Sequence, residues 1–146
     1  MAKSTNSQVR AGVWVDPEQV EQLRTAAYAD RFASYLKQRN EAIVTVLADT
    51  GLRVGELVGL DVKFLRNGNS EIFLPTRIQK DYPNENSPRP VPIGLADDTT
   101  RVVTSYLENR WKDSEALFPS RSADRITTQG VRDVVSALAQ EAGILS

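Results

Sequence analysis

Residues 49–60 read Asp49-Thr50-Gly51-Leu52-Arg53-Val54-Gly55-Glu56-Leu57-Val58-Gly59-Leu60 and directly follow a long apolar run. Gly51 suits the left-handed residue through which a chain leaves a helix, so we expect a helix to end there. The leucines that follow anchor a new segment in the core. Arg53 and Glu56 are three residues apart, which places their side chains on one face of a helical turn. Such a pair is also typical of a short solvated helix, so the spacing by itself assigns no function.

Composition limits the classes of protein that this chain can belong to. Of its 146 residues, 40% are hydrophobic and 25% are charged, which is ordinary for one soluble globular domain. The chain has no cysteine and no histidine, which excludes a disulfide framework and removes the commonest zinc ligand and general base. We therefore expect no metal and no cofactor. No apolar run approaches the roughly 20 residues that span a bilayer, and Met1 to Arg10 are too polar for a secretory signal. We expect a cytoplasmic protein without a membrane segment.

Apolar residues at helical spacing occupy both ends of the chain. Asp16 and Pro17 suit the start of a first helix, as cap and first helical residue. Gly143 suits the end of the last one. The other expected helices span Arg31–Thr50 and Val54–Leu60, and begin after a cap at Asp97 or Asp98 and after one at Thr127 or Thr128.

The middle of the chain is strand-like, with short extended runs at Lys63–Leu65, Glu71–Leu74 and Thr76–Lys80. Asn67-Gly68-Asn69 is a turn signal between the first two runs. The stretch Arg89-Pro90-Val91-Pro92-Ile93 predicts an edge strand, because proline has no N–H to donate to a central strand. We therefore predict an α+β fold that is mainly helical and holds a small three-stranded antiparallel sheet with a long hairpin.

The segment around Arg53 resembles the first conserved box of the tyrosine recombinases, the phage integrase family. The matching residues are Thr50-Gly51-Leu52-Arg53, Glu56-Leu57 and Leu60. The expected order of helices and strands also resembles the start of that family's catalytic domain. Weaker matches are the stretch at residues 89–93 and the last helix, from Ile126 to Ile144. The resemblance implies that residues 13–146 form a truncated recombinase catalytic domain after a disordered tail at residues 1–12.

The resemblance implies roles for a few residues. Arg53 would be a catalytic arginine that clamps the scissile phosphate, and Glu56 would support it by fixing the loop. The physical chemistry agrees, because a guanidinium presents a planar fork of donors to two phosphate oxygens. Lys80 would be the hairpin lysine that protonates the leaving 5′ oxygen, with Arg77 as the fallback and a solvated hairpin lysine as the alternative interpretation. The partner would be double-stranded DNA, bound by Arg53, Arg77, Lys80 and Arg89.

The rest of the family's chemistry has no counterpart in this sequence. The second box contains a histidine, and this chain has none. No tyrosine matches the position of the nucleophile: Tyr28 and Tyr106 are expected in the core, Tyr35 on a helix surface and Tyr82 in a loop. Without the nucleophile no phosphotyrosine intermediate can form. We predict that this polypeptide alone neither cleaves nor rejoins DNA, as a fragment of a site-specific recombinase or the product of a shortened gene.

Two other interpretations stay open at this point. The net charge of −1 counts against a strong, sequence-independent nucleic-acid binder, although it allows a local basic face. The chain could be a non-catalytic module that binds DNA weakly or forms a homo-oligomer through bare core surface. An unrelated helical transcription regulator is the third interpretation. The valine-rich last helix, with Arg132 as its single arginine, argues against it, because base readout needs several polar side chains.

Overall fold

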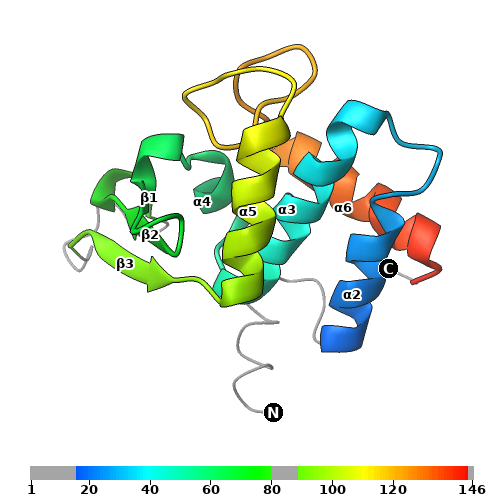
Figure 1. Ribbon diagram of the computed structural model, residues 1–146, viewed down its shortest axis with the longest axis horizontal. Helices are drawn as coiled ribbons and strands as arrows, with labels where there is room; N and C mark the ends of the chain where they lie inside the picture. The colour runs from blue at the N-terminus through cyan, green and yellow to red at the C-terminus, as the bar shows by residue number, and fades with distance from the viewer. Residues whose placement is uncertain (1–15, 80–88, 145–146) are drawn as a thin grey trace.

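The computed structural model describes residues 16–79 and 89–144, which form a group of helices with a small sheet at one end (Figure 1). Helix α3 packs against α2 and α5, and α6 packs against α2 and α4. The α+β class predicted from the sequence is confirmed. The elements in chain order are α2 (Pro17–Ala26), α3 (Ser34–Thr50), α4 (Val54–Val58), the 3-10 turn η1 (Val62–Phe64), β1 (Leu65–Arg66), β2 (Glu71–Leu74), the 3-10 turn η2 (Thr76–Ile78), β3 (Val91–Gly94), α5 (Asp97–Asn109) and α6 (Thr128–Ala142).

Most helix ends lie where the local sequence predicts them. Asp16 caps α2 through its Oδ1, which accepts the N–H of Glu18 at 2.9 Å. Gly51 ends α3 with a left-handed φ of 71°, as Gly143 ends α6 with a φ of 75°. The predicted start of α3 at Arg31 is wrong. The helix begins at Ser34, because the preceding Ala33 has extended backbone and residues 29–32 form a turn.

The caps of the last two helices differ in how well they were predicted. Thr127 caps α6, since its Oγ1 accepts the N–H of Gly130 at 2.9 Å. The predicted cap of α5 at Asp97 or Asp98 is wrong, because both lie in the first turn and Ala96 precedes the helix. The N–H of Ala96 instead donates to Oδ2 of Asp49 at 2.9 Å, which joins the last turn of α3 to the start of α5.

The sheet is antiparallel with the strand order β1-β2-β3, so the proline-containing strand β3 lies at an edge, as predicted. The turn between β1 and β2 is also confirmed. All three of its residues have left-handed φ angles, which are 56° for Asn67, 68° for Gly68 and 66° for Asn69. Asparagine and glycine tolerate this conformation better than other residues, which explains why the signal was readable.

The predicted extended run at Thr76–Lys80 is wrong in its described part. Residues 76–78 form the turn η2, whose N–H groups at Ile78 and Gln79 donate to Pro75 and Thr76. Gln79 is buried, and its side-chain amide donates to the carbonyl of Leu74 at 3.2 Å and to that of Arg89 at 3.0 Å. These two bonds satisfy carbonyls on both sides of the connection between β2 and β3. Lys80 lies outside the described residues.

The tyrosines test the predicted core. Tyr106 is buried, and its hydroxyl donates to the carbonyl of Leu117 at 2.8 Å. Tyr35 is exposed on α3, as predicted. The core prediction for Tyr28 is wrong, because this side chain is 47% exposed and its hydroxyl donates to Oε1 of Glu41 at 2.7 Å. Tyr82 lies outside the described residues.

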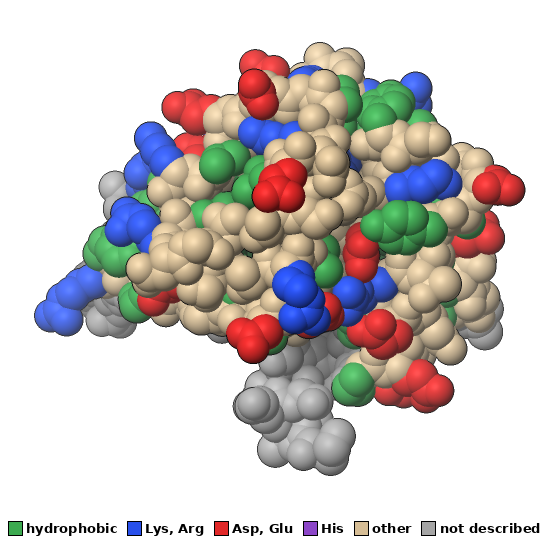
Figure 2. Space-filling model, viewed as in Figure 1, with side chains coloured by type: hydrophobic (Ala, Val, Ile, Leu, Met, Phe, Trp, Pro, Cys, Tyr) green, Lys and Arg blue, Asp and Glu red, His purple; other side chains and the backbone are tan. Residues whose placement is uncertain are grey.

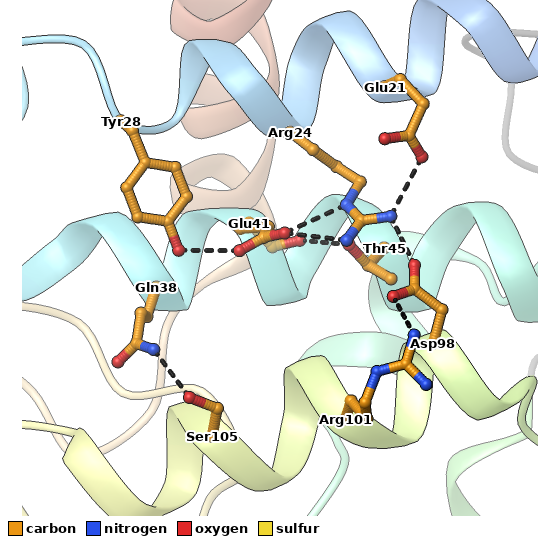
Figure 3. Close-up of polar contacts among 9 residues, drawn as sticks. All are labelled: Glu21, Arg24, Tyr28, Gln38, Glu41, Thr45, Asp98, Arg101 and Ser105. Atoms are coloured by element: carbon orange, nitrogen blue, oxygen red, sulfur yellow. Dashed lines mark hydrogen bonds and ion pairs between the residues drawn. The ribbon is translucent and has the colours of Figure 1, made fainter.

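Tyr28 belongs to a polar network in which Arg24 links α2, α3 and α5 (Figure 3). The guanidinium of Arg24 contacts Oε2 of Glu41 at 3.0 Å and Oδ2 of Asp98 at 2.6 Å, and it also bonds Glu21. The hydrogen bond from Arg24 lowers the pKa of the Asp98 carboxyl below its usual value. We call Glu21, Arg24, Tyr28, Glu41 and Asp98 the Arg24 network.

Candidate functional site

Arg53 lies immediately before α4. Its side chain is exposed, and hydrogen bonds fix its backbone. The N–H of Arg53 donates to Oε1 of Glu56 at 2.9 Å, and its carbonyl accepts the N–H of Leu57 at 2.9 Å. Glu56 is buried, so its carboxylate is a fixed acceptor beneath the chain. The supporting position predicted for Glu56 therefore has a direct geometric basis. The guanidinium itself remains in solvent, where an anion can reach it.

The turn before Arg53 is fixed by Thr50. Its Oγ1 donates to the carbonyl of Val46 at 2.7 Å and accepts the N–H of Leu52 at 3.1 Å. Leu52 and Leu57 are 2% and 0% exposed, so apolar side chains anchor both flanks of the arginine. Burial of such leucines stabilises a position by about 2–5 kcal/mol relative to alanine. The arginine therefore stands on a backbone that has little freedom to move.

The other end of α4 is held by a residue from a distant part of the chain. Arg125, just before α6, donates from Nη1 to the carbonyl of Val58 at 2.9 Å and from Nη2 to Oδ1 of Asp61 at 2.6 Å. Asp61 is buried and also pairs through its backbone with Ala116. Arg125 and Asp61 are not recognisable from the sequence, because no local pattern links residues that are 64 positions apart.

Cations gather on the sheet side of the molecule. Figure 2 shows Lys and Arg side chains projecting from the edge that carries the sheet. Arg66 lies 4.6 Å from the ring centre of Phe73, and Arg77 lies 5.6 Å from that of Phe64. Such stacking restrains a guanidinium while leaving its N–H groups available. The exposed cations that the structure describes in residues 53–94 are Arg53, Lys63, Arg66, Arg77 and Arg89.

The carboxylates described in the same region have other partners or little exposure. Glu56 and Asp61 are buried, and the half-buried Glu71 accepts the side-chain amide of Asn67 at 3.0 Å. Within the described part of residues 53–94, the fully exposed charged side chains are therefore all cations, although the net charge of the chain is −1. We call Arg53, Lys63, Arg66, Arg77 and Arg89 the sheet-end cations.

The structure brings α4 and the Arg77 turn together. A Cβ at Gly59, which follows α4, would lie only 3.4 Å from the side chain of Ile78, the neighbour of Arg77. Arg89 is exposed and lies just before β3, and its carbonyl accepts a hydrogen bond from the side-chain amide of Gln79. The position predicted for Lys80 lies outside the described residues.

The described residues contain neither a membrane-spanning helix nor a metal site. No helix in residues 16–79 and 89–144 is long and apolar enough to cross a membrane. Within the same ranges, no group of three or more potential ligand side chains could hold a metal ion.

Comparison with known proteins identifies the family of this chain. The model of the phage integrase family matches residues 13–145, which is almost the whole chain. The chain belongs to the phage integrase family. Its similarity to curated family members includes 32% identity over 120 residues to tyrosine recombinase XerC of Bifidobacterium longum, covering 73% of this chain and 31% of that protein. Tyrosine recombinase XerD of Oceanobacillus iheyensis is 31% identical over 118 residues, covering 75% of this chain and 36% of the other.

Solved structures of the phage integrase family share this fold. The XerA recombinase superposes with a TM-score of 0.71 at 27% identity, covering 92% of this chain and 44% of its own. A complex of the XerH site-specific recombinase with a palindromic difH substrate has a TM-score of 0.65 at 15% identity, covering 89% and 36%. The chain thus spans less than half the length of the relatives it matches here.

Proposed function

We propose that this chain is the part of a tyrosine recombinase catalytic domain that binds double-stranded DNA and supplies Arg53 to the scissile phosphate. The observation that carries the proposal is an exposed guanidinium on a backbone that buried Glu56 and two buried leucines hold in place. Phosphoryl transfer spreads negative charge over the phosphate oxygens. Preorganised donors that meet this charge contribute about 100- to 1000-fold in rate.

In this proposal Arg53 acts through two parallel N–H donors, which a guanidinium offers to neighbouring phosphate oxygens. Glu56 supports it without touching the substrate, because its carboxylate bonds the backbone N–H of Arg53. Lys80 remains the proposed hairpin acid, with Arg77 as its alternative. Arg77 is supported by its exposed side chain and by its neighbour Ile78, whose side chain lies close to Gly59 at the end of α4.

The sheet-end cations form the proposed DNA-binding surface. Their positions explain how a chain of net charge −1 can bind a polyanion, since affinity for DNA depends on local phosphate neutralisation. The description of the XerH neighbour as bound to a difH substrate supports the same partner. Self-association into a homo-oligomer stays a prediction of the sequence, and sedimentation of the purified chain tests it.

The first experiment compares Arg53→Ala with the parent chain in binding to a labelled duplex over a salt series. Loss of charged hydrogen bonds to phosphate costs about 1.5–3 kcal/mol, and the salt slope should fall by about 1. Arg101→Ala is the matched control, because Arg101 is a 72% exposed arginine that pairs with Asp98 on α5. Equal affinity and slope for the parent and Arg53→Ala would refute the phosphate role.

The second experiment asks whether these 146 residues react with DNA by themselves. A nicked duplex traps any covalent protein–DNA intermediate, and gel electrophoresis under denaturing conditions reveals it. We expect none, because the chain has no histidine for a second box and no tyrosine at the nucleophile's position. A covalent adduct with this chain would overturn that part of the proposal.

A further inference from the structure

We infer that Arg125 and Asp61 form a clamp that positions Arg53 by holding the far end of α4. The inference rests on the proposed phosphate role of Arg53. Neither residue reaches the exposed guanidinium, so both would be positioning residues that act through the helix. The clamp also makes the arginine box depend on a segment that lies just before α6.

Helix α4 needs external support because it has only five residues. A helix this short is not stable on its own in water, and its last carbonyls lack partners within the helix. Gly59 and Leu60 donate to the carbonyls of Glu56 and Leu57. Arg125 supplies a partner for the last helix carbonyl, that of Val58, at 2.9 Å, and it also donates to the carbonyl of Leu60 just beyond the helix at 3.3 Å. A cation is also favourable at this end of a helix.

Asp61 holds the clamp in place. Its side chain is only 8% exposed, whereas that of Arg125 is 40% exposed, and the two are 2.6 Å apart. A buried carboxylate without its cation is strongly unfavourable, so Asp61 fixes where the guanidinium sits. The neighbouring backbone is tied as well, because Leu117 donates to Leu60 and Glu115 accepts from Val62, both at 2.9 Å.

The clamp and Arg53 lie at opposite ends of one short rigid element. At 1.5 Å per residue, the five residues of α4 separate the two by about 8 Å. If the Val58 end is released, the helix can tilt or unwind, and the guanidinium moves away from a fixed phosphate. Glu56 fixes the N-terminal end of α4 and Arg125 fixes its C-terminal end. Because they act at different ends, one cannot replace the other in holding the helix.

Arg110 provides a matched control for this inference. It also lies next to the segment before α6 and also donates to three acceptors, the carbonyls of Ser114, Ala116 and Leu117. None of these belongs to α4. Arg110→Ala therefore removes a comparable set of hydrogen bonds but no bond to α4, which it affects only indirectly through the pairing of Leu117 with Leu60.

The test is a double-mutant cycle in the whole chain, read out by duplex binding over a salt series. We expect Arg125→Ala to weaken binding by about 3- to 10-fold and to lower the salt slope, with no further effect when Arg53 is already alanine. Arg110→Ala should lower the slope less than Arg125→Ala does, because it removes no direct bond to α4. An equal loss from Arg125→Ala in both backgrounds, or no loss in the parent, would overturn the inference.

Hydrogen exchange gives a second readout that does not need DNA. The N–H of Leu57, which bonds the carbonyl of Arg53, should exchange faster in Arg125→Ala than in the parent, relative to the amides of α3. Uniform acceleration in all helices would mean general destabilisation and would overturn the inference. If Arg125→Ala does not fold, Asp61→Asn replaces it, since the amide keeps the volume and loses the charge.

Failure of the inference and failure of the proposed function give different results. If Arg53→Ala binds DNA like the parent, the phosphate role is wrong. If Arg53→Ala weakens binding while Arg125→Ala does not, Arg53 binds phosphate without help from the clamp. Arg125→Lys should restore part of the binding, because an ammonium can pair with Asp61 but cannot fork to the helix carbonyls as well.

Discussion

The sheet-end cations and the Arg24 network use the same residue type in opposite ways. Arg24 lies between carboxylates from three helices, α2, α3 and α5, and forms ion pairs with all of them (Figure 3). Among the described residues, none of the sheet-end cations forms an ion pair. An arginine with internal partners holds helices together, whereas an exposed one without them is available to an external anion. Composition cannot reveal this difference, because an arginine of either kind adds the same single positive charge to the total.

The largest expected effect is the loss of stability when the Arg24 network is broken. Arg24→Ala leaves the half-buried Glu41 without its cation, and hydrogen bonds to charged groups contribute about 1.5–3 kcal/mol. We expect the free energy of unfolding to fall by about that amount in urea titrations, with an unchanged salt slope for DNA binding. A reduced slope would show that the network also serves the DNA surface. Arg24→Lys should recover only part of the stability, since one ammonium cannot serve both Glu41 and Asp98.

A smaller effect is expected when one of the sheet-end cations is removed. Arg66→Ala should lower the salt slope of duplex binding by about 1 and change stability by about 0.5 kcal/mol or less. Arg31→Ala is the control, because Arg31 also stacks on a phenylalanine, Phe32 at 5.0 Å, but lies between α2 and α3. The division between the two regions fails if both variants change DNA binding equally.

The smallest effect is a change in acid sensitivity. Arg24 lowers the pKa of Asp98 in the folded chain, so this carboxyl stabilises the fold above its unfolded pKa of about 3.9. That contribution is lost as the pH falls through the lower folded value. Asp98→Asn should therefore be less stable than the parent at neutral pH, with the gap closing below about pH 4. Half the Asp98 side chain is exposed, so solvent screening keeps the gap small. A gap that is constant from pH 7 to pH 3 would exclude this ionic origin.

The parts of the fold that local chemistry decides were predictable. Gly51, Thr127 and the Asn67–Asn69 turn each act within a few residues, and all three are confirmed. The bond from the backbone N–H of Arg53 to Glu56 is also local, because three residues separate them, whereas the supporting role of Glu56 stays a prediction.

What could not be predicted depends on contacts between distant segments. Tyr28 fits an apolar stripe, yet it turns outward because Glu41 accepts its hydroxyl. Asp49 replaces the expected cap of α5 from 47 residues away. Arg125 donates to Val58 of α4 from 67 residues away. The roles of Arg53, Lys80, Arg77 and Arg89 stay predictions until DNA binding is measured.

The amide of Gln79 has a consequence for how this chain tolerates changes in length. By bonding the carbonyls of Leu74 and Arg89, it closes the neck of the connection between β2 and β3. Insertions or deletions beyond that neck would leave the strand pairing intact, and doubling such a loop costs only about 0.6 kcal/mol. Changes in the number of residues between Gln79 and Arg89 should therefore cost little stability while the register of β2 and β3 stays the same.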